Sequence, residues 1–288
     1  MRTPMSAPIA LAPSLRPAPR PWRPTPAVQA SAALHAAGAA ALVVVPAAWP
    51  WVLGGLVANH AALVAAGLLP RSRTLGPNVT RLPAAAARRR EVALTFDDGP
   101  DPEVTPRMLD RLDEAGMTAT FFLIGERAAR HPALVREIVR RGHAVENHSH
   151  RHSMAFACYG LGRMRRDLEA AQAAIADAAG VAPVFFRAPF GIRSPLLDPV
   201  LARCGLHYAS WTRRGFDNVA RDRARVFDRL ARGAAAGDIF LLHDGTASRP
   251  RPSAAHALEV LPELGARLSA LGLRSVTLRT ACAGDDAP

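Results

Sequence analysis

The stretch Leu94-Thr95-Phe96-Asp97-Asp98-Gly99-Pro100 decides how the rest of the chain folds around it. Residues 91–97 predict a short buried strand, because apolar side chains alternate there with smaller ones. Two adjacent carboxylates follow, and Gly-Pro ends the strand in a turn. Neighbouring side chains at a strand end point in different directions, so one carboxylate could bind a metal ion while the other accepts a proton. Asp-Asp-Gly alone is more typical of an acidic turn, so residues further along must decide between the two.

Beyond residue 90 the chain alternates apolar segments with amphipathic ones. The apolar segments predict strands at residues 91–97, 118–124, 143–148, 184–188, 207–212, 238–243 and 274–279. The amphipathic segments predict helices at residues 104–115, 132–141, 160–179, 195–204, 222–235 and 255–271. This alternation predicts an α/β fold, and seven strands with six crossovers favour a parallel sheet closed into a barrel. In such barrels the chemistry collects at the carboxyl ends of the strands.

Composition excludes some classes of function. The formal net charge of +12 comes from arginines scattered along 288 residues, which leave room for one sizeable domain and extra segments. The chain has no zinc-finger spacing, recognition-helix pattern or aromatic stacking motif, so we expect no nucleic-acid partner. Contact with anionic membrane lipids explains the charge more simply. Three scattered cysteines, Cys158, Cys204 and Cys282, form no disulfide framework and are compatible with a reducing compartment.

The N-terminal third differs in composition from the rest. Its first residues are rich in Pro, Ala and Arg, which predicts a flexible arm. Two uncharged apolar runs follow, 27–48 and 51–69, and each is long enough to cross a bilayer as a helix. Trp49 and Trp51 between them suit an interfacial turn. The alternative is a pair of alanine-rich soluble helices, which normally carry charges on one face. The chain therefore divides into a disordered arm (1–26), two transmembrane helices (27–70), a basic linker (71–90) and a catalytic domain (91–282).

The arginines predict the orientation of this hairpin. They occur before the first apolar run and after the second, and the turn between the runs has none. By the positive-inside rule both ends face the cytoplasm. We expect the protein to be anchored in the bacterial inner (plasma) membrane, with the catalytic domain on the cytoplasmic side. If only one run spans, the domain lies on the periplasmic side instead.

A group of histidines follows the third predicted strand. His148 and His152, four residues apart, would share one face of a helical turn and could bind one metal ion together with Asp98. His150 would point away, and we assign it no role. The alternative is a surface patch of four histidines that includes His143. Two histidines and one carboxylate form a common open catalytic set, which leaves positions for water and substrate.

Later strand ends supply further candidates. Arg187, after the fourth strand, could hold a carboxylate through its planar guanidinium. The backbone N–H of Phe190 could donate to an oxyanion. His243, after the sixth strand, is a natural general acid; the alternative is a histidine satisfied in a turn by Asp244.

Taken together, residues 91 to about 280 resemble the polysaccharide deacetylase family, also called the nodulation-protein-B homology domain or carbohydrate esterase family 4. Five motifs occur in that family's order. They are Thr95-Phe96-Asp97-Asp98-Gly99-Pro100, His148-Ser149-x-x-His152, Arg187-x-Pro189-Phe190, Trp211 with Asp217, and Leu241-Leu242-His243. The first two are highly specific, and residues 1–90 lie outside the resemblance.

The resemblance implies a deformed (β/α) barrel and one divalent metal ion, Zn²⁺ in the first place, with Co²⁺ or another divalent ion as alternatives. It implies metal ligation by Asp98, His148 and His152. It implies Asp97 as general base toward a water at the metal, Arg187 steadying Asp97, His243 as general acid, and Asp217 tuning His243. The N–H of Phe190 would help to hold the oxyanion, Trp211 would line the substrate groove, and Leu242 would line the acetyl-methyl pocket.

Four residues depart from the family's commonest pattern. Phe190 replaces a tyrosine, Glu146 a glycine, Arg214 an aspartate and Asn218 a tryptophan. The changes at 214 and 218 concern the substrate groove, so they bear on sugar specificity rather than on the chemistry.

The expected function is a metal-dependent hydrolase that cleaves non-peptide carbon–nitrogen bonds. It would remove N-acetyl, or other small N-acyl, groups from a sugar in a polysaccharide or a lipid-linked glycan. An O-acetyl carbohydrate esterase and a catalytically silent, membrane-tethered sugar-binding protein are the alternatives.

Overall fold

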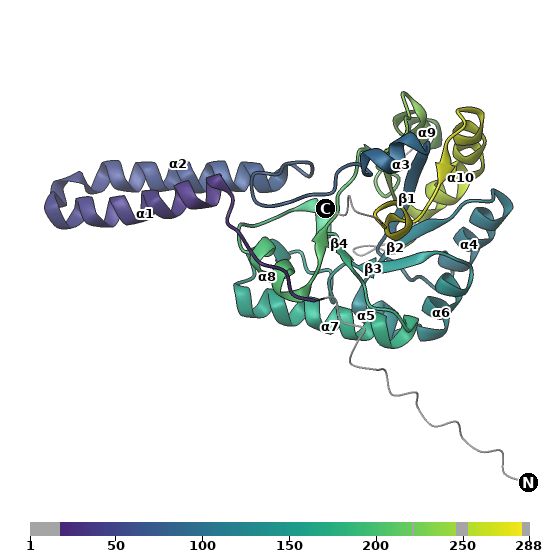
Figure 1. Ribbon diagram of the computed structural model, residues 1–288, viewed down its shortest axis with the longest axis horizontal. Helices are drawn as coiled ribbons and strands as arrows, with labels where there is room; N and C mark the ends of the chain where they lie inside the picture. Colours follow the sequence, from purple (N-terminus) through teal and green to yellow (C-terminus); the bar gives the residue numbers. More distant parts are fainter. Residues whose placement is uncertain (1–17, 221, 246–252, 284–288) are drawn as a thin grey trace, which may run out of the picture.

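A computed structural model describes residues 18–220, 222–245 and 253–283 (Figure 1). The described part of the chain contains one parallel sheet of eight strands, in the order β5-β4-β3-β2-β1-β7-β6, with β8 beside β1. The strands are β1 (Glu91–Asp97), β2 (Ala119–Leu123), β3 (Ala144–Asn147), β4 (Phe185–Phe186), β5 (His207–Tyr208), β6 (Arg213–Arg214), β7 (Ile239–His243) and β8 (Arg274–Ser275). The predicted α/β fold with a barrel-like parallel sheet is confirmed, but the described strands form a curled half-barrel and not a closed one, because β5 and β6 at its two edges do not pair.

Helices cover the outer face of the sheet, whose centre is β1 (Figure 1). They are α4 (Thr105–Glu114), α5 (Gly125–Arg130), α6 (Pro132–Arg140), α7 (Leu161–Ala179), α8 (Leu197–Cys204), α9 (Arg223–Ala231) and α10 (Ser253–Ala270). Every residue of β1 is buried, because its two faces contact two different cores. Leu94 and Phe96 pack with the outer helices, whereas Ala93 belongs to the inner cluster. Strands buried on both faces are expected where helices cover a parallel sheet.

Two predicted strands are shorter than expected. The predicted strand at residues 207–212 ends after Tyr208. Ala209 forms only an isolated bridge with Val79, and the next strand, β6, lies against β7 on the opposite edge of the sheet. Residues 274–279 end as a strand at Ser275, because Thr277 begins a short helix, α11 (Leu278–Ala281), and accepts a hydrogen bond from the Thr280 N–H at 3.0 Å.

The predicted linker, residues 71–90, packs into the domain. Val79 bonds to the backbone on both sides of Ala209, and the Leu82 N–H donates to the Gly237 carbonyl. This segment therefore lies between β5 and the start of β7, where the described strands of the curled sheet leave an opening. Its apolar side chains join the inner core, and part of it forms α3 (Ala84–Arg88).

Residues 18–25 run along the domain in extended conformation. Arg20 forms an ion pair with Asp198 at 3.1 Å and its N–H donates to the Ala202 carbonyl. The rest of the predicted arm, residues 1–17, lies outside the described residues.

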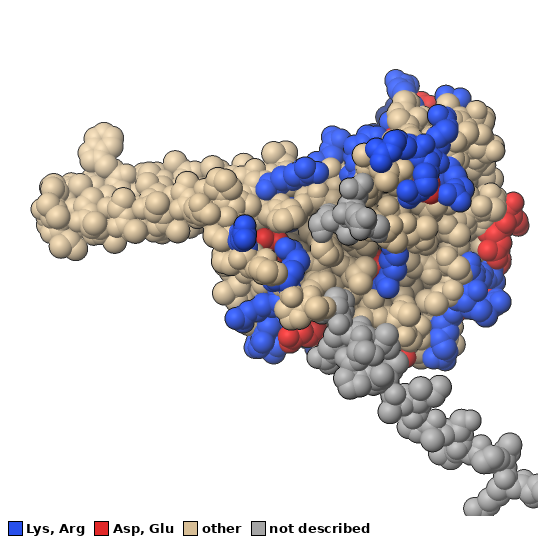
Figure 2. Space-filling model, in the orientation of Figure 1, with Lys and Arg blue, Asp and Glu red and all other residues tan. Residues whose placement is uncertain are grey.

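Two apolar helices form a hairpin that projects from the domain (Figure 1). They are α1 (Pro26–Val44) and α2 (Trp49–Leu68), joined by the 3₁₀ turn η2 (Pro46–Ala48). The hairpin carries no charged side chain, in contrast to the domain (Figure 2). In each span, only 6% of the 18-residue hydrophobic stretch is buried. By length and composition both helices could cross a membrane.

Candidate active site and metal centre

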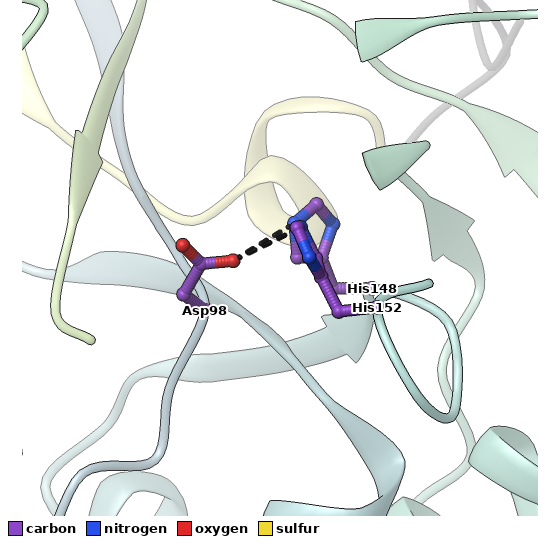
Figure 3. A group of neighbouring side chains, drawn as sticks. All are labelled: Asp98, His148 and His152. Atoms are coloured by element: carbon purple, nitrogen blue, oxygen red, sulfur yellow. Dashed lines mark ion pairs between the residues drawn. The ribbon is translucent and has the colours of Figure 1, made fainter. Parts of the chain in front are cut away.

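Asp98, His148 and His152 form a compact group at the carboxyl ends of β1 and β3 (Figure 3). One ligand atom from each lies within 4.8 Å of the others. Asp98 Oδ1 is 3.4 Å from His148 Nε2 and 3.2 Å from His152 Nε2, yet it accepts no hydrogen bond. A buried carboxylate oxygen facing two ring nitrogens without hydrogen-bonding to them suits a cation between the three groups.

The two histidines are brought together by a loop and not by the predicted helical turn. The chain leaves β3 at Asn147, and both Ser149 and His152 have positive φ angles, of 67° and 48°. The Asn147 Oδ1 accepts the Ser149 N–H at 2.8 Å, and the Ser149 Oγ accepts the His152 N–H at 3.0 Å. These bonds hold an uncommon backbone conformation. The side chains that shape the loop, Asn147 and Ser149, had no assigned role in the sequence-based prediction.

The protonation of His148 agrees with metal binding. Its Nδ1 lies 2.9 Å from the Arg187 carbonyl, which can only accept, so Nδ1 carries the hydrogen and Nε2 presents a lone pair to the centre. Burial lowers the pKa of His152 to about 4, which keeps this ring neutral at pH 7. Both imidazoles therefore fit a divalent ion.

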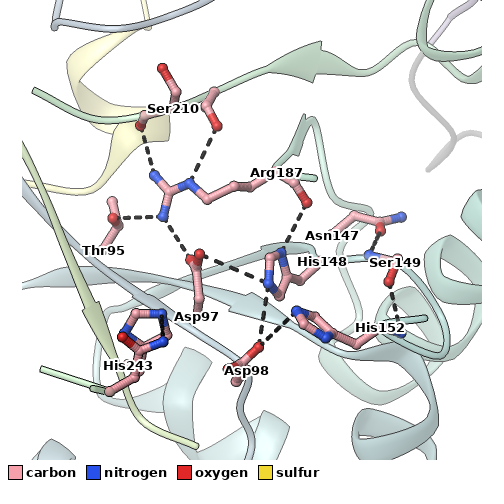
Figure 4. Close-up of polar contacts among 12 residues, drawn as sticks. Thr95, Asp97, Asp98, Asn147, His148, Ser149, His152, Arg187, Ser210 and His243 are labelled. Carbon is pink, nitrogen blue, oxygen red and sulfur yellow. Dashed lines mark hydrogen bonds and ion pairs between the residues drawn. The ribbon is translucent and has the colours of Figure 1, made fainter. Parts of the chain in front are cut away.

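Arg187 fixes Asp97 beside this centre (Figure 4). The guanidinium is completely buried and donates to Asp97 Oδ1 at 2.7 Å. It also donates to Thr95 Oγ1 and to the carbonyls of Ala209 and Ser210. Asp97 Oδ2 is left facing the centre, 3.9 Å from His148 Nε2. The structure thus separates the two adjacent aspartates, as the strand-end geometry predicts.

His243 lies on the other side of the two aspartates from the histidine pair (Figure 4). Its Nδ1–H donates to Asp217 Oδ1 at 3.0 Å, and its backbone N–H donates to Asp217 Oδ2 at 2.9 Å. Burial lowers the pKa of His243, but the negative charges of Asp217, Asp98 and Asp97 outweigh it and raise the pKa to about 9. A protonated ring held in one orientation can donate a proton from Nε2.

Phe190 occupies a strained turn beside the centre. Its φ is 59°, its ring is 42% exposed, and it lies 4.8 Å from the His152 ring. Among the described residues the Phe190 N–H has no acceptor. Trp211 is nearly buried behind this turn, and it approaches Gly191 so closely that a Cβ there would lie 2.6 Å from its ring.

The predicted role of Leu242 does not agree with its position. Leu242 is fully buried in the outer core, the cluster that also holds Phe96. Side chains alternate along β7, so Leu241 shares the inward face with His243 and packs in the cluster of Trp211.

The other histidines of the group do not reach the centre. His143 Nδ1 accepts the Ala119 N–H at 3.1 Å, and the His150 N–H donates to Asp167. Asp244 does not bind His243: it accepts from Thr105 Oγ1 at 2.6 Å. A Cβ on Gly99 would lie 2.3 Å from the Asp244 carboxylate, so only glycine fits there.

Comparison with known proteins agrees with this geometry. The profile of the family described as Polysaccharide deacetylase matches residues 84–209. The chain is 38% identical over 172 residues to a chitooligosaccharide deacetylase of Sinorhizobium fredii, covering 57% of this chain and 76% of that protein. It is 33% identical over 184 residues to a peptidoglycan-N-acetylglucosamine deacetylase of Bacillus cereus, covering 60% of this chain and 81% of that protein. A solved peptidoglycan N-acetylglucosamine deacetylase, in complex with 4-naphthalen-1-yl-N-oxidanyl-benzamide, superposes with a TM-score of 0.65 at 28% identity, covering 71% of this chain and 92% of that one.

Proposed function

Because the chain belongs to the polysaccharide deacetylase family, we propose that it is a metal-dependent amidase that removes acetyl, or another small acyl, groups from N-acylated sugars. The observation that carries the proposal is the pairing of Asp97, held by Arg187, with His243, held by Asp217, on two sides of one candidate metal centre. The named activities of the similar proteins, on peptidoglycan and chitooligosaccharides, point to the same class of substrate.

The proton transfers follow from the hydrogen bonds. Arg187 occupies Asp97 Oδ1, so Oδ2 is the atom that accepts a proton from the water attacking the acyl carbon. As the carbon–nitrogen bond breaks, His243 Nε2–H donates its proton to the departing nitrogen, and the products are a carboxylic acid and an amine. The free N–H of Phe190 donates to the oxygen that becomes negative. Leu241, which packs on the inward face of β7, would contact the acyl methyl group.

Asp98, His148 and His152 would hold the metal. A divalent ion there supplies Lewis acidity toward water and the acyl carbonyl, and Zn²⁺ suits two imidazoles and one carboxylate.

Mass spectrometry of acetylated glycans incubated with the Zn²⁺-loaded full-length protein tests the proposal. We expect a loss of 42 mass units per acetyl group from N-acetylated oligosaccharides, the value set by exchanging an acetyl group for hydrogen. Loss of acetyl only from O-acetylated glycans would identify an esterase. Binding without any loss from either would identify a silent sugar-binding protein.

We further propose that the hairpin anchors the enzyme in the bacterial inner membrane with the domain on the cytoplasmic side. Both ends of the hairpin lie at the domain, and uncharged apolar helices with few buried residues need an apolar solvent. The flanking arginines favour the cytoplasmic face. This side would give access to lipid-linked or nucleotide-derived sugars. A reporter active only in the periplasm, fused after Pro288, should stay inactive, and an active fusion would place the domain outside.

A further inference from the structure

The Arg214 guanidinium stands in the candidate active site and has no hydrogen-bond or ion-pair partner among the described residues. It lies on β6, whose two residues point to opposite faces. Arg213, on the outer face, is saturated: it donates to Asp238 and to the carbonyls of Arg232 and Gly233. Arg214 donates to none of the described residues, and its Nε is buried without an acceptor. A buried, unused donor costs free energy unless a ligand satisfies it.

Two aromatic rings hold the Arg214 guanidinium in place. It lies 4.6 Å from the centre of the Phe216 ring and 5.4 Å from that of Trp211. Trp211 in turn lies 5.8 Å from the guanidinium of Arg187, which binds Asp97. Stacking on rings orients the planar fork while leaving its N–H edge free. Phe216 is 41% exposed, so this edge of the site is open to a ligand.

The charges of the site do not need Arg214. Asp97, Asp98 and Asp217 bring three negative charges, and Arg187, protonated His243 and a bound divalent ion would bring four positive ones. Burial lowers the pKa of Arg214, and the charges of Asp97 and Asp217 act in the opposite direction, which places its guanidinium within electrostatic reach of the catalytic carboxylates. The site therefore has an excess positive charge on the substrate side.

We propose that Arg214 binds an anionic group of the substrate, a carboxylate or a phosphate carried close to the acylated nitrogen. This inference rests on the proposed function and narrows its substrate to acidic N-acylated glycans. The two terminal nitrogens of a guanidinium together match two oxygens of such a group. A sugar bearing a carboxyl-containing ether substituent and a sugar linked to a lipid through phosphate both present this chemistry, whereas chitooligosaccharides do not.

Binding measurements on the full-length, Zn²⁺-loaded protein in detergent test the proposal. Three ligands are compared: neutral chitotetraose, an oligosaccharide of the same length with carboxyl-bearing N-acetylated sugars, and an N-acetylglucosaminyl diphospholipid. We expect Arg214→Met to weaken binding of the favoured anionic ligand by about 10- to 100-fold, as for loss of a charge-assisted bidentate hydrogen bond, and to leave chitotetraose unchanged. Arg214→Lys should restore part of the affinity. The anionic ligand that loses affinity identifies the carboxylate or the phosphate as the group bound.

The matched control is Arg229→Met, because Arg229 lies 5.2 Å from the same Phe216 ring but is exposed on α9. It should change none of the affinities. An equal effect of Arg214→Met on neutral and anionic ligands, or no effect on any, would overturn the proposal. Turnover is measured separately with the same ligands: no acetyl release from any of them would contradict the proposed function, while the dissociation constants would still decide the role of Arg214.

Discussion

His143 provides a test of the fold that is independent of the catalytic centre. Its side chain is 5% exposed, its Nδ1 accepts the Ala119 N–H, and its ring packs edge-on against Phe121. Protonation would destroy the hydrogen bond and bury a charge. Burial accordingly lowers the pKa of His143 from 6.5 to about 4. The unfolded chain then binds a proton that the native protein does not bind, so the contribution of His143 to stability is present above pH 6.5 and decreases as the pH falls toward 4.

The size of the effect follows from the two pKa values. Between pH 7.5 and pH 5, linkage gives a loss of about 2 kcal/mol in the free energy of unfolding from His143 alone. In His143→Asn, the amide oxygen can still accept the Ala119 N–H but does not titrate. Urea unfolding of both full-length proteins in detergent, followed by far-ultraviolet circular dichroism, gives the free energies at the two pH values. We expect the variant to be less stable at pH 7.5 and to lose about 2 kcal/mol less on acidification. Equal losses would refute the neutral, buried state of His143.

Three further predictions concern the centre and its support. Asp97→Asn should retain one divalent ion, measured by elemental analysis, and should lower kcat by a factor on the order of 10² to 10⁴, as expected for loss of a general base. Asp98→Ala, in contrast, should lose the ion. Loss of the ion in Asp97→Asn would show that the roles of the two aspartates are reversed. The pKa of about 9 at His243 predicts that kcat/KM falls as the pH rises through 9, because this general acid loses its proton. Asp217→Asn should move this fall to lower pH, and an unchanged pH profile would contradict the pairing of His243 with Asp217. Glu146 is completely buried and accepts hydrogen bonds from two backbone N–H groups and from an arginine. Glu146→Ala should therefore lower the free energy of unfolding, measured with urea, by about 3 to 5 kcal/mol, as for breaking a buried ion pair. A change below about 1 kcal/mol would show that the ion pair is dispensable.

Local patterns in the sequence were sufficient for the fold class and for bringing several candidate side chains to one edge of the sheet. Apolar alternation predicted β1 to within its observed bounds, and polar residues after several predicted strands marked the edge where the side chains meet. This works because parallel strands place their carboxyl ends together, so chain order alone brings Asp97, Asp98, His148 and His243 to one edge. The same period of two could have shown that Leu241, and not Leu242, shares the face of His243.

Other features depended on contacts between distant parts of the chain. The composition of residues 71–90 predicted a basic linker. In the structure, their few apolar side chains pack in the opening between β5 and β7. Nothing local distinguishes His143 from His148: one is satisfied by the backbone of β2 and the other by the Arg187 carbonyl. Likewise, the substitution at Arg214 is visible in the sequence, but only the fold shows which donors around it are already used. A sequence records the groups that can bind, whereas the tertiary structure decides which of them are already satisfied.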